Sequence, residues 1–131
     1  MASIGTVTLT IVPDVANANI TVKYSLTGSA FDVASGQPYT ELCQLIGDDT
    51  GINPPEDNVD DPIPSGVLTS IFSTVTFPNT TPINRVRTKT IPKLNLNEDV
   101  GTDEIRAVVT LTPIPASKVT RESNPPVTGN F

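Results

Sequence analysis

The chain has 131 residues, no histidine, one cysteine and a formal net charge of −6. This length suits a single domain, which at this size buries roughly two-thirds of the surface of its unfolded chain. The lack of histidine excludes serine–histidine and cysteine–histidine catalysis and zinc sites built on imidazole. An acidic chain is also poorly suited to nucleic acids or anionic membranes, whose phosphates attract clustered lysine and arginine.

The first half of the chain carries the clearest strand patterns. Apolar and polar residues alternate at 4–12, where Pro13 ends the run, and again at 18–27. Successive side chains of a strand point to opposite faces, so both runs predict strands with one buried and one wet face. For the second strand, a continuation past Gly28 to Phe31 is left open.

Residues 39–46 fit two patterns. Tyr39, Leu42, Cys43 and Ile46 have helical spacing, with Gly47 as a C-terminal cap. The preceding Ser35-Gly36 sequence is instead a turn signal and indicates a hairpin, so we favour a strand. In either case Cys43 lies among apolar residues and is predicted to be a small buried side chain rather than a reactive thiol.

Three further strands are predicted at 67–77, 83–91 and 104–112, with a short candidate at 93–96. The strand at 67–77 is apolar and free of charge, which on an exposed edge would promote aggregation. We therefore expect it to be a central strand, with a subunit interface as the alternative.

The strand at 104–112 and the residues after it differ in their patterns. The alternation at 104–112 places four residues on the inward face: Ile105, Ala107, Val109 and Leu111. Residues 116–131 show no apolar period and are expected to form an extended C-terminal tail.

The number and spacing of these strands predict an all-β, single-domain antiparallel β-sandwich over residues 1–115. We expect about 6–8 strands of the immunoglobulin or fibronectin type III kind, with a long acidic loop at 47–65. The cysteine pair and core tryptophan of immunoglobulin domains are absent. Barrels and jelly rolls therefore stay open as alternatives.

The acidic loop is the candidate metal site. Carboxylates are the ligands that calcium prefers, and the nearest basic residues along the chain are Lys23 and Arg85. The spacing does not fit an EF-hand, and a solvated acidic loop is the favoured alternative. The candidate calcium ligands within 48–61 are Asp48, Asp49, Asp57, Asp60 and Asp61.

Arg85, Arg87 and Lys89 alternate along one predicted strand and therefore share one of its faces. Like charges in a row protect a sheet edge against pairing with other chains. Pairing with the acidic loop or with Glu104 is a second explanation. The functional alternatives are that the three residues bind an external polyanion or a protein partner.

These features favour a non-enzymatic β-sandwich module that binds or assembles with protein, either another protein or a second copy. The alternative is a calcium-dependent binding module that uses the loop at 48–61. A small enzyme that uses carboxylates or a serine–lysine pair is the least favoured hypothesis. Neither a signal peptide nor a run of 18 apolar residues is visible, so a cytoplasmic protein or part of an assembly is expected by default.

Overall fold

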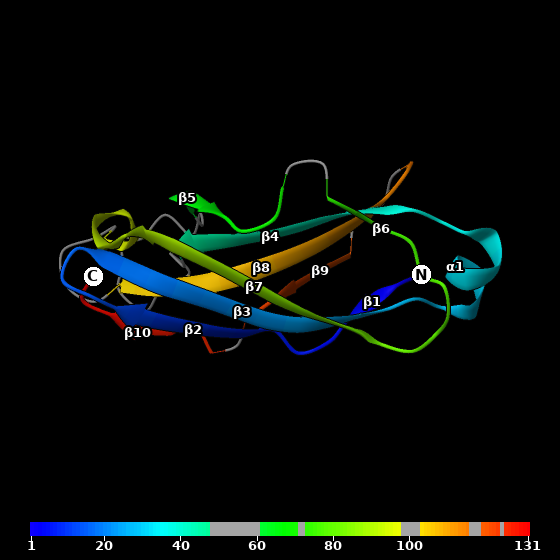
Figure 1. The fold of residues 1–131 in the computed structure, drawn as a ribbon, viewed down its shortest axis with the longest axis horizontal. Helices are drawn as coiled ribbons and strands as arrows, with labels where there is room; N and C mark the ends of the chain where they lie inside the picture. Colours follow the sequence, from blue (N-terminus) through cyan, green and yellow to red (C-terminus); the bar gives the residue numbers. More distant parts are fainter. Residues whose placement is uncertain (48–60, 71–72, 98–102, 116–118, 124) are drawn as a thin grey trace, which may run out of the picture.

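The computed structural model describes residues 1–47, 61–70, 73–97, 103–115, 119–123 and 125–131. These residues form two antiparallel sheets and two short helical segments (Figure 1). Sheet A contains β1 (Ser3–Ile4), β2 (Thr8–Pro13), β3 (Asn17–Thr27) and β7 (Ile83–Pro92). Sheet B contains β4 (Tyr39–Gly47), β5 (Asp61–Val67), β6 (Thr74–Val75), β8 (Asp103–Pro113), β9 (Val119–Glu122) and β10 (Val127–Gly129). The helical segments are α1 (Ala30–Ser35) and the 3-10 helix η1 (Lys93–Leu96).

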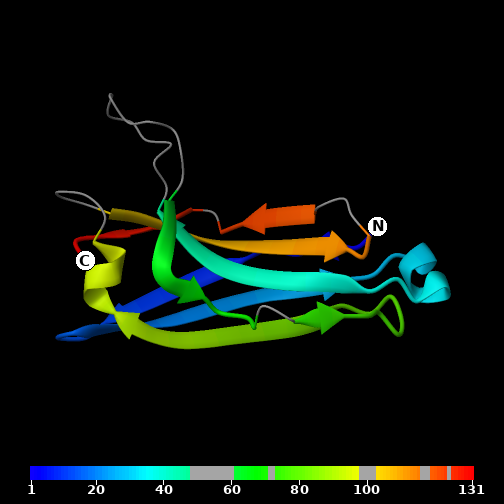
Figure 2. The same cartoon turned by 90° about the horizontal axis from the view of Figure 1, so that it is seen from above.

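The sheets form two layers around one core, as an all-β sandwich requires (Figure 2). In sheet A, β3 lies between β7 on one side and β1 and β2 on the other. In sheet B, β4 and β8 are central; β5 and β6 pair with β4, while β9 and β10 pair with β8. The inward side chains of β3 are almost fully buried: Ala18, Ile20, Val22, Tyr24 and Leu26.

The predictions for the central strands of sheet B are confirmed. Residues 39–46 lie in β4, and Cys43 is fully buried there as a free cysteine. These residues form a strand rather than a helix because β4 faces the core on one side and pairs with β8 along its whole length. On β8, the predicted inward residues Ile105, Ala107, Val109 and Leu111 are all fully buried.

The continuation of β3 past Gly28 is not observed, because a helix begins there instead. Ser29 caps α1: its Oγ accepts a hydrogen bond from the Asp32 N–H at 3.2 Å, and the Asp32 carboxylate accepts one from the Ser29 N–H at 2.9 Å. Such a reciprocal capping box satisfies two donors that a helix N-terminus otherwise leaves free. A Cβ at Gly28 would lie 2.5 Å from Phe77, so glycine permits the close approach where the chain leaves β3.

The prediction of one central strand at 67–77 is wrong. Within its described residues, β5 ends at Val67 and β6 covers only Thr74–Val75, and both pair with the outer side of β4. Burial of single side chains explains the apolar composition without a continuous strand: Phe77 packs edge-to-face on Tyr39 with ring centroids 5.8 Å apart.

The ends of the predicted loop and tail also differ from expectation. β5 begins at Asp61, inside the predicted loop at 47–65, and includes Pro62 and Pro64, which suit a strand paired on one side only. The segment at 93–96 is a 3-10 helix rather than a strand. In the predicted tail at 116–131, β9 and β10 pair with β8. These strands are too short and too polar to give an apolar period.

Candidate functional site

β7 is the longest edge strand among the described elements. Its ten residues pair with β3 on one side, and no described strand pairs with the other side. Figure 2 shows β7 along one border of the molecule, and the Val67 carbonyl of β5 lies within hydrogen-bond distance of its Lys89 side chain. The other edge strands are shorter or contain proline, both of which discourage pairing with a foreign strand.

The pairing register determines which backbone groups of β7 face outward. The Ser25 carbonyl accepts a hydrogen bond from the Gly5 N–H at 2.9 Å, so odd-numbered residues of β3 turn toward β1 and β2. Even-numbered residues of β3 then turn toward β7, where they lie opposite odd-numbered residues. The backbone N–H and C=O groups that point away from the sheet therefore belong to Asn84, Val86, Thr88 and Thr90.

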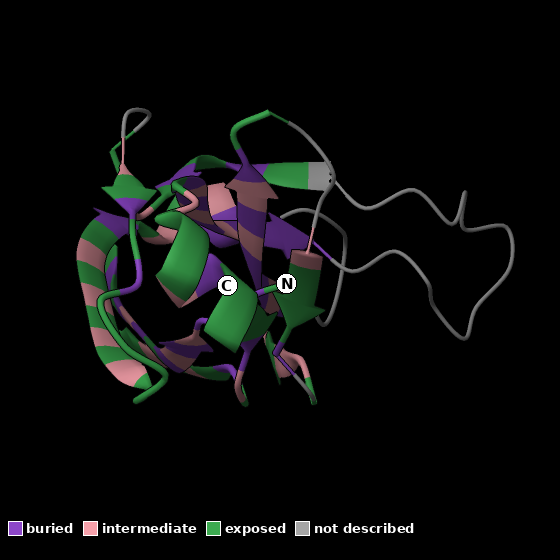
Figure 3. Cartoon of the chain, turned by 90° about the vertical axis from the view of Figure 1, so that its right-hand side faces the viewer, coloured by how far each residue is buried: buried purple, intermediate pink, exposed green. Residues whose placement is uncertain are grey.

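The side chains of these four residues lie on the outer face of sheet A and are exposed. None of them is charged, and Val86 exposes 59% of its surface. Figure 3, viewed from the α1 end, shows the alternation as intermediate and exposed bands along the strand at the left margin. The outer face of this edge is thus uncharged, and the charged residues of β7 all lie on its inner face.

The inner face of β7 carries the three predicted cations, between Ile83 and Ile91. Arg85 lies opposite Tyr24 of β3, Arg87 opposite Val22 and Lys89 opposite Ile20. All three are half-buried, because they point toward sheet B from the margin of the core. We call Arg85, Arg87 and Lys89 the cationic row.

The cationic row meets a carboxylate from the opposite sheet. Glu41 of β4 is buried and accepts a hydrogen bond from Arg87 Nη2 to its Oε2 at 2.8 Å. The Tyr24 hydroxyl donates to the same oxygen at 2.5 Å, and Arg87 Nε donates to the Tyr24 oxygen at 3.3 Å. Arg85 Nη2 lies 3.2 Å from Glu41 Oε1, an ion pair without hydrogen-bond alignment.

This environment changes how Glu41 and Tyr24 titrate. Burial alone would raise the pKa of Glu41, but hydrogen bonds from Arg87 and Tyr24 and the charge of both arginines hold it below its usual value. Burial and the Glu41 carboxylate raise the pKa of Tyr24, so the phenol stays protonated and donates.

The pKa of the buried Cys43 thiol rises to about 12, mainly through burial, which leaves it unreactive near neutral pH.

The cationic row keeps an excess of positive charge. Among the described residues, Glu41 is the one carboxylate that contacts it. Lys89 instead donates from Nζ to the Val67 carbonyl of β5 at 3.1 Å. Counted over the described residues, three cations against one carboxylate leave two positive charges along this margin between the sheets.

The structure therefore brings together the three predicted partner-binding residues and adds Glu41, which the sequence reasoning missed. The predicted internal partner Glu104 lies elsewhere, on β8 opposite Thr128 of β10. A sequence signal for Glu41 did exist, because it occupies an inward position between Tyr39 and Cys43 of an apolar strand. A lone acid on an apolar face implies a cationic partner.

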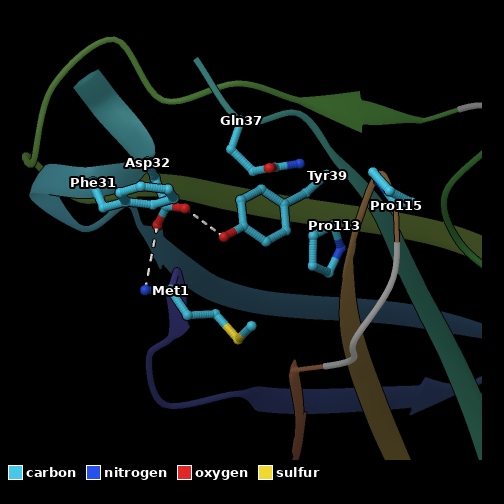
Figure 4. A pocket seen from close by; sticks show the side chains of 7 residues that line it. All are labelled: Met1, Phe31, Asp32, Gln37, Tyr39, Pro113 and Pro115. Atoms are coloured by element: carbon cyan, nitrogen blue, oxygen red, sulfur yellow. Dashed lines mark hydrogen bonds and ion pairs between the residues drawn. The ribbon is translucent and has the colours of Figure 1, made fainter. Parts of the chain in front are cut away.

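A pocket of about 340 Å³ lies at the α1 end of the sandwich (Figure 4). Phe31, with 71% of its surface exposed, and Met1 form its apolar rim. Gln37 lines another part of the pocket, where its Nε2 donates hydrogen bonds to the carbonyls of Pro38 and Ile114 at 2.9 and 3.0 Å. The lining residues are Met1, Phe31, Asp32, Gln37, Tyr39, Pro113 and Pro115.

The polar groups of this pocket are used within the fold. The buried Asp32 carboxylate accepts hydrogen bonds from the Tyr39 hydroxyl at 2.6 Å and from the Ser29 hydroxyl at 2.8 Å, and lies 3.9 Å from the N-terminal amine. Burial would raise the pKa of Asp32, but these hydrogen bonds lower it. A carboxylate so engaged stabilises α1 and the start of β4.

The predicted calcium ligands Asp48, Asp49, Asp57 and Asp60 lie outside the described residues, and the description of Asp61 is limited to its backbone, which begins β5. Within the described part of the chain, no group of three or more acidic or cysteine side chains is arranged to hold a metal ion. The calcium site stays a prediction. In the same part of the chain, no helix has the length and hydropathy to cross a membrane.

We compared the chain with protein-family models, curated proteins and solved structures, and none of them matches.

Proposed function

We propose that the protein is a non-enzymatic interaction module that binds an extended segment of another protein along the open edge of β7. The observation that carries this proposal is the row of outward backbone groups on Asn84, Val86, Thr88 and Thr90. A strand added to such an edge gains main-chain hydrogen bonds, while alternate side chains provide specificity.

We also infer that the sandwich is of the fibronectin type III or related immunoglobulin kind. The sheet orders β2-β3-β7 and β9-β8-β4-β5 support this inference, because they correspond to strands A-B-E and G-F-C-C′ of those folds. Folds of this kind serve many functions, so the topology alone does not favour one partner over another.

Two variants of Thr88 test strand addition. Thr88→Pro removes one outward N–H, and the backbone bonds to β3 remain because odd-numbered residues make them. Thr88→Ala changes the same side chain but keeps the N–H and serves as the matched control. Labelled protein is applied to an array of random nine-residue peptides, after circular dichroism has shown that both variants fold.

Strand addition predicts a set of peptides that bind the wild type and Thr88→Ala but not Thr88→Pro. Val86→Pro, at the neighbouring outward position, should abolish binding to the same set. An array without binders, or binders that tolerate both proline substitutions, would contradict the proposal.

A further inference from the structure

The cationic row indicates which kind of segment the β7 edge accepts. We propose that the partner is an extended protein segment with carboxylates at alternate positions, which face Arg85, Arg87 and Lys89. This inference rests on the proposed strand addition and specifies the chemistry of the added strand.

The spacing of the charges supports this partner. Side chains on one face of a strand repeat every two residues, or about 6.7 Å. A strand added to β7 would therefore place every second side chain beside the cationic row, at the same spacing as the cations. Carboxylates at these positions form cross-strand pairs with opposite charges, which stabilise adjacent strands.

The cationic row carries more positive charge than Glu41 neutralises, so it can pair with further carboxylates. Glu41 neutralises one of the three cations, and its position between the two arginines fixes their side chains at the margin. Arg85 and Arg87 each keep 27% of their side-chain surface exposed. Lys89 is held by a neutral carbonyl, so its charge is available to an added strand.

The same charges disfavour a second copy of this chain. If two β7 strands paired antiparallel about a two-fold axis normal to the sheet and centred at residue 87, Arg87 would face Arg87. Arg85 would then face Lys89, because their numbers are symmetric about that centre. Like charges directly opposite destabilise a strand pair. The cationic row thus favours an acidic partner strand and disfavours pairing with the β7 strand of a second copy.

Three synthetic peptides test this inference. The first is a capped nine-residue peptide in which glutamate alternates with threonine, and the second has glutamine in place of each glutamate. A third peptide has the composition of the first but contiguous glutamates, so that fewer carboxylates share one face. Affinity is measured by calorimetry in low salt, and backbone amide signals of β7 are followed by NMR.

We expect the alternating glutamate peptide to bind about tenfold more tightly than both other peptides and to lose this advantage as salt screens the charges. Lys89→Gln should weaken its binding several-fold without an effect on the glutamine peptide. Lys23→Gln, which removes the same charge from the exposed outer face of β3, should leave binding unchanged.

Two results would overturn the inference in distinguishable ways. Equal affinity for the glutamate and glutamine peptides, with shifts at the outward amides of β7, would refute the acidic partner but leave strand addition intact. No binding by any peptide at millimolar concentration would refute the acidic partner, and unshifted outward amides would count against strand addition itself.

Discussion

Arg87 and Glu41 join the two sheets through a hydrogen-bonded ion pair of 2.8 Å, one residue from β7 and the other from β4. The carboxylate is buried, whereas the guanidinium reaches the margin of the sandwich. This pair accounts for two properties of the fold. It satisfies an acid on an apolar strand, and it fixes part of the cationic row on the inner face of β7.

The first prediction concerns the stability that this pair provides. Glu41→Gln should lower the free energy of unfolding by about 3 kcal/mol, because it leaves two partly buried guanidiniums without a counter-charge. Urea denaturation followed by fluorescence or circular dichroism measures the change. Glu122→Gln is the matched control: Glu122 is 46% exposed and 3.9 Å from Arg106, so the expected loss is within about 0.5 kcal/mol. Equal losses in both variants would refute the structural role of Glu41.

The second prediction is a dependence of stability on pH. The pKa of Glu41 is lower in the folded protein than in the unfolded chain, so its contribution is fully present above the unfolded pKa. It is lost as the pH falls through the folded pKa, in the acidic range below about 4. Unfolding free energies at several pH values should therefore fall more steeply for the wild type than for Glu41→Gln. The remaining slope of the variant includes Asp32, whose pKa is also lowered. If the unfolding free energies of the two proteins changed with pH in parallel, Glu41 would have the same pKa in the folded and the unfolded chain.

The third prediction concerns self-association. Lys89→Glu should create an opposite-charge pair with Arg85 of a second copy in the two-fold β7 arrangement. Sedimentation velocity should then reveal dimers of the variant at concentrations where the wild type is monomeric. Lys23→Glu makes the same charge change on the outer face of β3 and should stay monomeric. A wild type that dimerises through β7 would contradict the role assigned to the cationic row.

The fourth prediction concerns Cys43. Its thiol is fully buried, and burial raises its pKa to about 12. Ellman's reagent at pH 8 should therefore not react with the native protein and should titrate one thiol after denaturation in guanidinium chloride. Rapid reaction in native buffer would show that β4 opens far more readily than its position in sheet B implies.

Much of the fold could be predicted from alternation, because β3, β4, β7 and β8 are long and keep one face on the core. Alternation also placed Arg85, Arg87 and Lys89 on one face. It did not reveal α1, which has only six residues and depends on the local Ser29 cap rather than on an apolar period.

The candidate site could not be predicted from the sequence, because its residues are distant along the chain. Glu41 and Arg87 are 46 positions apart, and only the packing of β4 against β7 brings them together. The outward direction of the Thr88 backbone likewise follows from the register with β3, which composition does not determine. The prediction of one strand at 67–77 is wrong for a different reason. Single apolar side chains can be buried without belonging to one continuous hydrogen-bonded strand.

Backbone amide hydrogen exchange along β7 measures whether the edge of this strand is open. In the free protein, the N–H groups of Arg85, Arg87 and Lys89 should be protected by β3, whereas those of Val86, Thr88 and Thr90 should exchange rapidly. The alternating glutamate peptide should then protect the three outward amides. Outward amides as well protected as Arg87 in the free protein would show that the edge of β7 is closed and would contradict the account.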